Sequence, residues 1–211
     1  GTQKTARIRY VIIDEAQDYS PLQYECIRLF FAQASVTMLG DLDQSITPHL
    51  SLGGYESITS LFPPEETLFL RFTKSYRSTA EIISFAGAIL NRSGEIDSVG
   101  RHGEAPSVLQ LESENAVQEA IAQDIRTLTA SGHASIGILT ETKAEAKALH
   151  HALKEHVSVQ TLLGGEDSVP RGAVVLPAYL AKGLEFDAVI LANAGGEHYH
   201  HESERLLLYT A

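Results

Sequence analysis

Short apolar runs alternate with longer amphipathic stretches along the whole chain. Apolar runs rich in β-branched residues are typical of buried parallel strands, and they occur at 10–13, 36–40, 67–70, 107–111, 135–139, 157–163, 172–176 and 187–191. The amphipathic stretches predict helices at 21–32, 55–61, 78–90, 115–130, 142–155 and 202–211. Strands that alternate with helices predict an α/β fold, in which helices cover both faces of a parallel sheet.

Helix boundaries carry local signals. Ser20 before Pro21 is typical of an N-cap followed by Pro at the first helical position. Capping boxes are predicted at Ser78–Glu81 and at Thr142–Glu145. Helical spacing predicts the inward faces of two helices, Leu22, Cys26, Leu29 and Phe30 in the first and Val117, Ile121, Ile125 and Leu128 in the helix at 115–130.

Composition narrows the class of protein. The net charge of −11 argues against strong autonomous nucleic-acid binding. No run of about 18 apolar residues is present, so no membrane span is expected. The single cysteine, Cys26, excludes an internal disulfide and fits a reducing, cytoplasmic location.

Acidic residues follow the first two predicted strands. Asp14 and Glu15 come directly after the strand at 10–13, and Asp41-Leu42-Asp43-Gln44-Ser45 follows the strand at 36–40. The carboxyl ends of parallel strands meet at one sheet edge, where α/β proteins bind ligands. Carboxylates there suit Mg2+ and its bound phosphate. As an alternative, Asp41 and Asp43 are plain turn residues.

Five stretches stand out in order along the chain: Ile13-Asp14-Glu15-Ala16-Gln17-Asp18, Leu39-Gly40-Asp41-Leu42-Asp43-Gln44-Ser45-Ile46, Ser75-Tyr76-Arg77-Ser78-Thr79, Ala181-Lys182-Gly183-Leu184-Glu185-Phe186-Asp187 and Glu204-Arg205-Leu206-Leu207-Leu208-Tyr209-Thr210-Ala211. They resemble motifs II, III, IV and V and the opening of motif VI of the UvrD/Rep-type superfamily 1 DNA helicases, in the family's order. The resemblance implies a RecA-like helicase core that uses ATP and Mg2+ and acts on DNA. With the turn at 62–66 as boundary, residues 1–64 would be the last part of the first core and residues 65–211 most of the second.

The resemblance also implies roles around the phosphates. Asp14 matches the acid that holds Mg2+, and Glu15 the residue that activates the attacking water. Gln44 matches a γ-phosphate sensor. Arg77 matches an arginine finger, for which a planar guanidinium is suited; its alternatives are cover for an apolar patch or a pair with Glu81.

Further roles are implied for nucleoside and nucleic acid. Tyr76 matches an aromatic that stacks on adenine, with a place at the core's edge as its alternative. Glu185 matches the acid that contacts the ribose, and Gly183 permits close backbone approach there. Lys182 matches a nucleic-acid phosphate contact, with a solvated surface charge as its alternative.

The phosphate-binding loop Gly-x-x-x-x-Gly-Lys-Ser/Thr does not occur in the 211 residues. The family places that loop upstream of motif II and a second finger arginine just after motif VI. We therefore expect a C-terminal fragment that does not hydrolyse ATP unaided. The sequence between Arg77 and Lys182 is accounted for by the second core's own elements, so the large insertion of UvrD and Rep is absent or minimal.

Motif V usually carries Thr and His upstream of Lys-Gly, where this chain has Pro177 and Tyr179. This pattern is similar to helicase-IV-like proteins of Gram-positive bacteria, some of which act on RNA polymerase. The expected function is an ATP-dependent helicase or translocase. Its alternatives are a motor that remodels RNA polymerase without unwinding, a two-metal nuclease that uses Asp14, Glu15, Asp41 and Asp43, and a non-catalytic interaction module.

Overall fold

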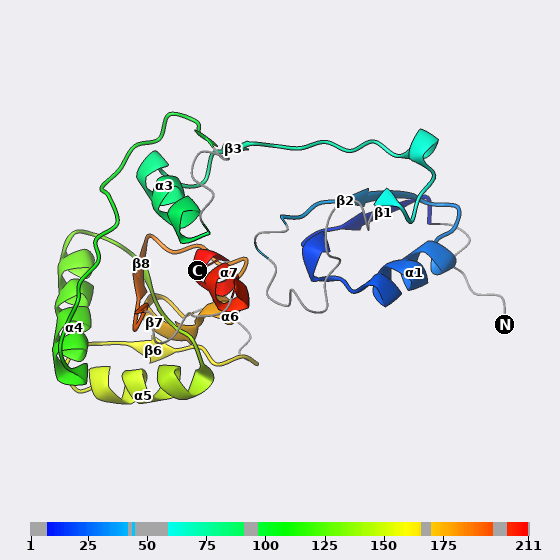
Figure 1. Ribbon diagram of the computed structural model, residues 1–211. Coiled ribbons are helices and arrows are strands. Elements are labelled where there is room, and N and C mark those ends of the chain that lie inside the picture. Colours follow the sequence, from blue (N-terminus) through cyan, green and yellow to red (C-terminus); the bar gives the residue numbers. More distant parts are fainter. Residues whose placement is uncertain are drawn as a thin grey trace.

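The computed structural model describes residues 8–41, 44, 59–90, 97–165, 170–195 and 202–210 (Figure 1). Its N-terminal unit contains β1 (Tyr10–Ile13), the 3-10 turn η2 (Ala16–Asp18), α1 (Pro21–Phe30), β2 (Ser35–Met38) and η4 (Pro64–Glu66). Its C-terminal unit contains β3 (Lys74–Ser75), α3 (Ala80–Ile89), β4 (Asp97–Ser98), α4 (Glu114–Ala130), β5 (Ser135–Thr140), α5 (Lys143–Leu153), β6 (Gln160–Thr161), β7 (Gly172–Pro177), α6 (Ala178–Ala181), β8 (Ala188–Leu191) and α7 (Glu202–Thr210).

In the N-terminal unit, α1 covers one face of a two-stranded parallel sheet. The helix begins as predicted, because Ser20 and Gln23 form a capping box and Pro21 occupies the first turn. A small core of Ile13, Ala16 and Tyr24 lies between helix and sheet. On the sheet's other face, Tyr10 and Ile12 are exposed.

The predicted inward face of α1 was wrong. Leu22, Leu29 and Phe30 are each more than half exposed, and Cys26 is exposed as well. Tyr24 is the residue of α1 that is fully buried, and its hydroxyl donates a hydrogen bond to the carbonyl of Ala16. This bond to the turn after β1 sets the rotation of the helix, a tertiary constraint that helical periodicity does not contain.

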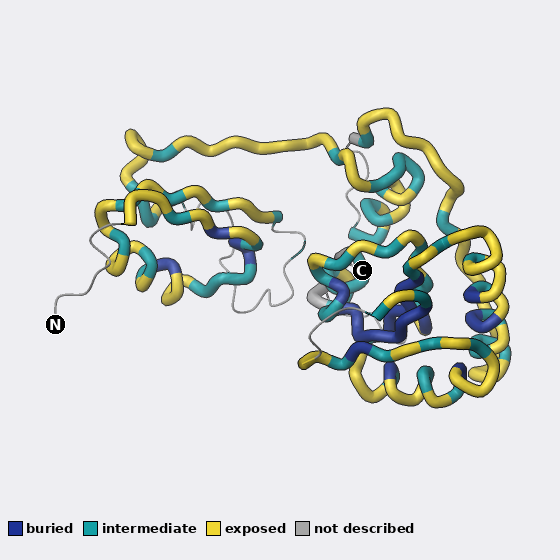
Figure 2. The backbone as a smooth tube through the Cα atoms, turned by 180° about the vertical axis from the view of Figure 1, so that it is seen from behind, coloured by how far each residue is buried: buried dark blue, intermediate teal, exposed yellow. Residues whose placement is uncertain are grey.

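The C-terminal unit is built on a four-stranded parallel sheet of order β6-β7-β5-β8, which confirms the predicted α/β class. Helices α4 and α5 pack on one face, where Ile121 and Ile125 are buried as predicted. The other face packs against α6 and the segment that follows it, through Leu180, Leu184 and Phe186. Figure 2 shows that burial is concentrated in the central strands of this unit.

Two predicted strands, 67–70 and 107–111, are extended but belong to none of the described sheets. Leu68 is 81% exposed and Val108 76%. Figure 2 shows both stretches coloured as exposed along nearly all of their length. A ladder of hydrogen bonds requires a neighbouring strand as well as an apolar sequence, and the pairing nearby is instead the short one between β3 and β4.

The start of α3 also differs from the prediction by one residue. Thr79, and not Ser78, is the N-cap, and its hydroxyl accepts from the amide of Ile82. Thr142 caps α5 as predicted, whereas the four-residue helix α6 was not predicted. The predicted helix at 55–61 lies largely outside the described residues. Among the described helices, none combines the length and apolar character that crossing a bilayer requires.

Candidate functional site

The chain turns sharply where β1 ends. Glu15 has φ 51° and ψ 43°, a left-handed conformation that is unfavourable for a residue with a side chain. Its amide donates to Asp14 Oδ1 at 2.9 Å. Backbone strain of this kind is concentrated at functional sites, so the turn that carries both predicted acids is the natural centre of the site.

Gln17 connects the ends of β1 and β2. Its side chain is buried, donates through Nε2 to Glu15 Oε2 at 2.6 Å, and accepts through Oε1 from the amide of Asp41 at 3.0 Å. A Cβ atom on Gly40 would lie 2.4 Å from Gln17 Oε1, so the absence of a side chain at this position allows the connection. The two strand ends are thus joined into one surface, and we call Asp14, Glu15, Asp18 and Asp41 the acidic rim.

Gln44 lies at this rim. Its Nε2 donates to Asp41 Oδ2 at 2.9 Å, and its carbonyl accepts from Lys182 Nζ at 3.1 Å. Asp43, the other acid predicted here, lies outside the described residues.

Lys182 reaches the rim from the C-terminal unit. Its Nζ lies 2.5 Å from Asp18 Oδ2 and 3.1 Å from Glu15 Oε2, and its side chain is only 8% exposed. A lysine this buried needs such anionic partners. The predicted contact of Lys182 with a nucleic-acid phosphate does not fit this placement, because the ammonium is enclosed by protein carboxylates.

Tyr24 is hydrogen-bonded to the turn that follows β1. Burial, with the nearby charges of Tyr19 and Asp18, raises the pKa of Tyr24 to about 12. Its hydroxyl therefore stays protonated and keeps its hydrogen bond to the Ala16 carbonyl within the strained turn.

Arg77 lies on the other side of the segment that follows α6. Its Nη2 donates to the carbonyl of Leu184 at 2.9 Å, and its Nε lies 3.4 Å from Glu185 Oε1. The alternative pairing with Glu81 is not formed by the described atoms, because Glu81 contacts His102 and the amide of Gly103.

The segment 182–185 therefore joins both halves of the predicted site. At one end Lys182 binds the acidic rim, at the other Leu184 and Glu185 hold Arg77, and Gly183 adopts φ 78° between them. Asp14, Glu15 and Gln44 lie together on the rim, while Arg77 contacts that segment and not the rim carboxylates. Tyr76 projects into solvent at 70% exposure.

Asp14 offers exposed oxygen donors for a metal ion. Mg2+ in nucleotide sites is held by one or two carboxylates, phosphate oxygens and water, so this donor fits the predicted ion. Within the described ranges, no group of three or more His, Cys, Asp or Glu side chains is arranged to hold a metal without such a substrate.

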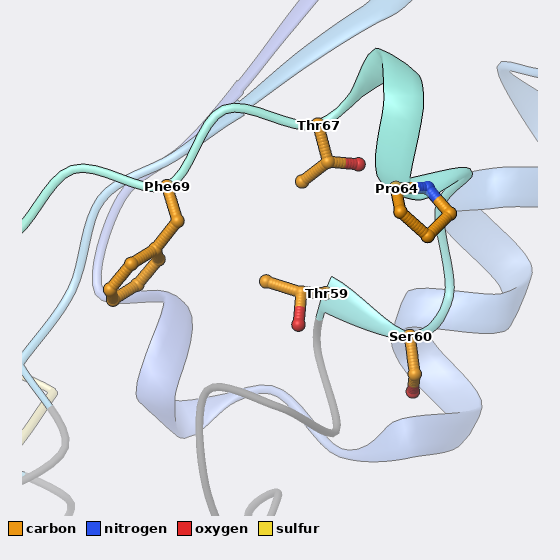
Figure 3. A pocket seen from close by; sticks show the side chains of 5 residues that line it. All are labelled: Thr59, Ser60, Pro64, Thr67 and Phe69. Carbon is orange, nitrogen blue, oxygen red and sulfur yellow. The ribbon is translucent and has the colours of Figure 1, made fainter.

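A cavity of about 330 Å³ lies elsewhere, beside η4. Thr59 and Ser60 line it on one side, and Pro64, Thr67 and Phe69 complete it (Figure 3). None of these five side chains is ionisable, so they offer no charged group to a ligand.

Sequence reasoning missed Gln17, Asp18 and Gly40 as parts of the site, although all three lie within the motifs it quoted. It also missed Arg101, whose guanidinium donates to the carbonyls of Tyr76 and Arg77. An arginine in a polar loop carries no sequence signal for that contact.

Family models match two parts of the chain. Residues 2–47 match the UvrD/REP helicase N-terminal domain, and residues 70–167 match the UvrD-like helicase C-terminal domain. The first match contains the acidic rim, and the second begins just before Tyr76 and Arg77.

Individual proteins agree with these matches. DNA helicase II of Escherichia coli is 29% identical over 169 residues, which is 75% of this chain and 23% of that protein. ATP-dependent DNA helicase srs2 of Schizosaccharomyces pombe is 29% identical over 161 residues, 70% of this chain and 18% of that protein. The chain thus spans about a quarter or less of these curated relatives.

A solved structure is similar over a larger share of its length. The C-terminal domain of a possible DNA helicase from Lactobacillus plantarum WCFS1 is 37% identical, with a TM-score of 0.54, and the match covers 64% of this chain and 79% of that one. Together with the two domain matches, this similarity shows that the chain belongs to the UvrD/Rep helicase family.

Proposed function

We propose that this chain is part of an ATP-dependent DNA helicase or translocase, with ATP and Mg2+ bound at the acidic rim. One observation carries the proposal: Lys182, from the segment that also holds Arg77, binds Glu15, Asp18 and the carbonyl of Gln44. The catalytic acids of one unit and the finger arginine of the other are therefore connected through four consecutive residues. DNA is the proposed nucleic acid along which the protein moves, because the similar proteins are named DNA helicases. The proposal also includes a cytoplasmic location.

Asp14, Glu15 and Gln44 each have a defined task in this mechanism. Asp14 would ligate Mg2+, which neutralises charge on the β- and γ-phosphates. Glu15 would accept a hydrogen bond from the attacking water, since its carboxylate is already oriented by Gln17 at 2.6 Å. Gln44 would sense the γ-phosphate by exchanging its bond to Asp41 for one to phosphate.

Arg77 must change partners to act. Its guanidinium now contacts the carbonyl of Leu184 and the carboxylate of Glu185, and both contacts are exposed to solvent and weak. A phosphate with several negative charges would compete well for this cation. Glu185 would then be released for the ribose and Tyr76 would stack on adenine.

The proposed domains are residues 1–64 and 65–211, which would move relative to one another as ATP is bound and hydrolysed. The extended segment 67–73 has no regular secondary structure and joins the two units, so it is the natural place for the change in angle (Figure 1).

Two substitutions in the full-length protein test the proposal. Glu15→Gln should bind ATP normally and lose turnover by about 100-fold or more. Arg77→Ala should slow hydrolysis by about 1,000-fold with a small change in binding. Glu25→Gln and Arg28→Ala are matched controls, because these exposed residues of α1 pair with each other. Turnover that survives both test substitutions would refute the proposed site.

A second candidate is a motor that remodels RNA polymerase without unwinding duplexes, as in the helicase-IV-like branch. Pro177 and Tyr179 favour it, because they replace the usual Thr and His of motif V. A strand-displacement assay beside a polymerase pull-down separates the two functions. Displacement without polymerase binding supports the helicase.

A further inference from the structure

Residues 97–103, which we call the brace, lie along the segment 75–81 that carries Tyr76 and Arg77. The contact begins with the parallel pairing of β3 and β4, which sets Lys74 against Asp97 and Ser75 against Ser98. It continues where the amide of Val99 donates to the carbonyl of Ser75 at 3.0 Å. The segment is thereby held at its start.

Arg101 holds the middle of the segment. Its Nη1 donates to the carbonyl of Tyr76 at 3.2 Å and to that of Arg77 at 2.9 Å. Its own carbonyl accepts from the amide of Ala80 at 2.9 Å, in the first turn of α3. One side chain therefore bonds the backbone of both residues proposed to contact the nucleotide.

The brace is anchored at its far end as well. Glu81 accepts from the amide of Gly103 at 2.9 Å and lies 3.0 Å from His102 Nδ1. The hydrogen bond with His102 makes the largest contribution, and together these contacts lower the pKa of Glu81 to about 2. Its carboxylate is therefore charged at neutral pH. A Cβ on Gly103 would lie 2.9 Å from Thr79 Cγ2, which shows how closely the brace approaches the N-cap of α3.

Packing alone does not fix Tyr76 and Arg77. Tyr76 is 70% exposed, and the side chain of Arg77 is 61% exposed. Where these side chains point therefore depends on the backbone between β3 and α3, a stretch without secondary structure of its own. The guanidinium of Arg101 supplies the hydrogen bonds that this backbone would otherwise make to water.

We propose that Arg101 is a positioning residue, which fixes the backbone from which Tyr76 and Arg77 reach the nucleotide. The inference rests on the function proposed above for those two residues. A misplacement of about 1 Å in a catalytic group can cost about 100-fold in rate. Arg101 would thus affect turnover without touching substrate.

The first test measures the segment directly and needs no ATP turnover. The chain contains no tryptophan, so Tyr76→Trp introduces a sole tryptophan whose fluorescence can be followed. In this background, Arg101→Ala should lower the fluorescence anisotropy, and Arg101→Lys should restore part of it, because a lysine can still donate to one carbonyl. Arg126→Ala is the matched control, since Arg126 also donates to a backbone carbonyl, that of His156, far from the brace.

Anisotropy that is unchanged in Arg101→Ala would overturn the proposal. Thermal unfolding followed by circular dichroism checks that the variants are folded. If Arg101→Ala does not fold, Arg101→Lys and Ser98→Ala take its place, because Ser98 Oγ donates to the carbonyl of Ser78 in the same brace. Both substitutions should lower the anisotropy, by less than the decrease expected for Arg101→Ala. Anisotropy that is unchanged in both variants would overturn the proposal.

The second test uses ATP turnover of the full-length protein. Arg101→Ala should lower kcat by about 10- to 100-fold, with KM for ATP rising only a few-fold and Arg101→Lys restoring part of kcat. Normal turnover in Arg77→Ala would refute the proposed function itself. Loss of turnover in Arg77→Ala together with normal kcat in Arg101→Ala would refute only the positioning role.

Discussion

Gly40→Ala should disrupt the acidic rim without touching a charged residue. The new Cβ would lie 2.4 Å from Gln17 Oε1, closer than carbon and oxygen can approach, and 3.1 Å from the amide nitrogen of Ala16. Gln17 is buried, and a carbon cannot remain 2.4 Å from its Oε1, so its amide must leave its present position.

The loss can be estimated from the bonds that Gln17 makes. Moving its amide breaks the bond from the Asp41 amide, worth about 1 kcal/mol, and the bond to the Glu15 carboxylate, worth about 1.5 kcal/mol at the lower end of its class. The lower end applies because the Glu15 side chain is 45% exposed. With residual crowding against Ala16, we expect a loss of about 2–4 kcal/mol in the local stability of the β1–β2 unit.

Native-state hydrogen exchange measures this loss locally. The amides to follow are those of Ala16, which donates to the carbonyl of Leu39, and of Leu39, which donates to that of Ile13, both at 2.8 Å. Gly195→Ala is the control, because a Cβ there meets no atom of the described residues within 4 Å and its φ is not in the left-handed region. It should leave the exchange of both amides unchanged.

A double-mutant cycle tests the cause. Gln17→Ala removes the atom that the new Cβ meets, so Gly40→Ala should cost much less in the Gln17→Ala background than in the wild type. Equal costs in the two backgrounds would show that Gln17 does not mediate the effect, and the amide of Gln17 would then not be what joins the ends of β1 and β2.

Three further predictions concern other charged or titratable groups. The pKa of Tyr24 is raised to about 12, so its contribution to stability is complete below pH 10 and is lost between pH 10 and 12; Tyr24→Phe should remove this step from alkaline unfolding curves. The amides of Ser135 and Ala134 lower the pKa of Asp187, so the wild type should lose stability as the pH falls below 3.8, and Asp187→Asn should lack that dependence in acid unfolding. Lys182→Met removes the ammonium that links the C-terminal unit to Glu15 and Asp18 of the N-terminal unit, so the radius of gyration from small-angle X-ray scattering should rise. It should stay constant in the exposed control Lys147→Met, and constancy in both variants would refute the bridging role of Lys182.

The sequence predicted elements best where a local pattern sufficed. The helix α4 shows a regular apolar stripe, and β5 and β7 are almost wholly apolar, so their positions follow from periodicity and composition. The rotation of α1 did not follow, because it depends on one hydroxyl bond between Tyr24 and Ala16. The strands expected at 67–70 and 107–111 failed for a similar reason, since partner strands are a property of the whole fold.

The candidate site shows the same division. Motifs predicted that Asp14, Glu15 and Gln44 share one edge, because they follow adjacent strands. They did not predict that Lys182 would bind Asp18, a residue 164 positions away in the sequence. Nor did they predict the contacts of Arg101 with Tyr76 and Arg77, because a guanidinium bound to main-chain carbonyls leaves no residue pattern behind.

The exposed stretch 67–72 has a consequence for handling the protein. Leu68, Leu70 and Phe72 recur at every second position and are 81%, 64% and 84% exposed. Such an exposed extended segment can pair with the same segment of a neighbouring molecule, as unpaired edge strands do in aggregating proteins. Repulsion between the negatively charged molecules therefore keeps these segments apart in a concentrated sample. High salt screens that repulsion and should shorten the time for which the sample stays free of aggregates.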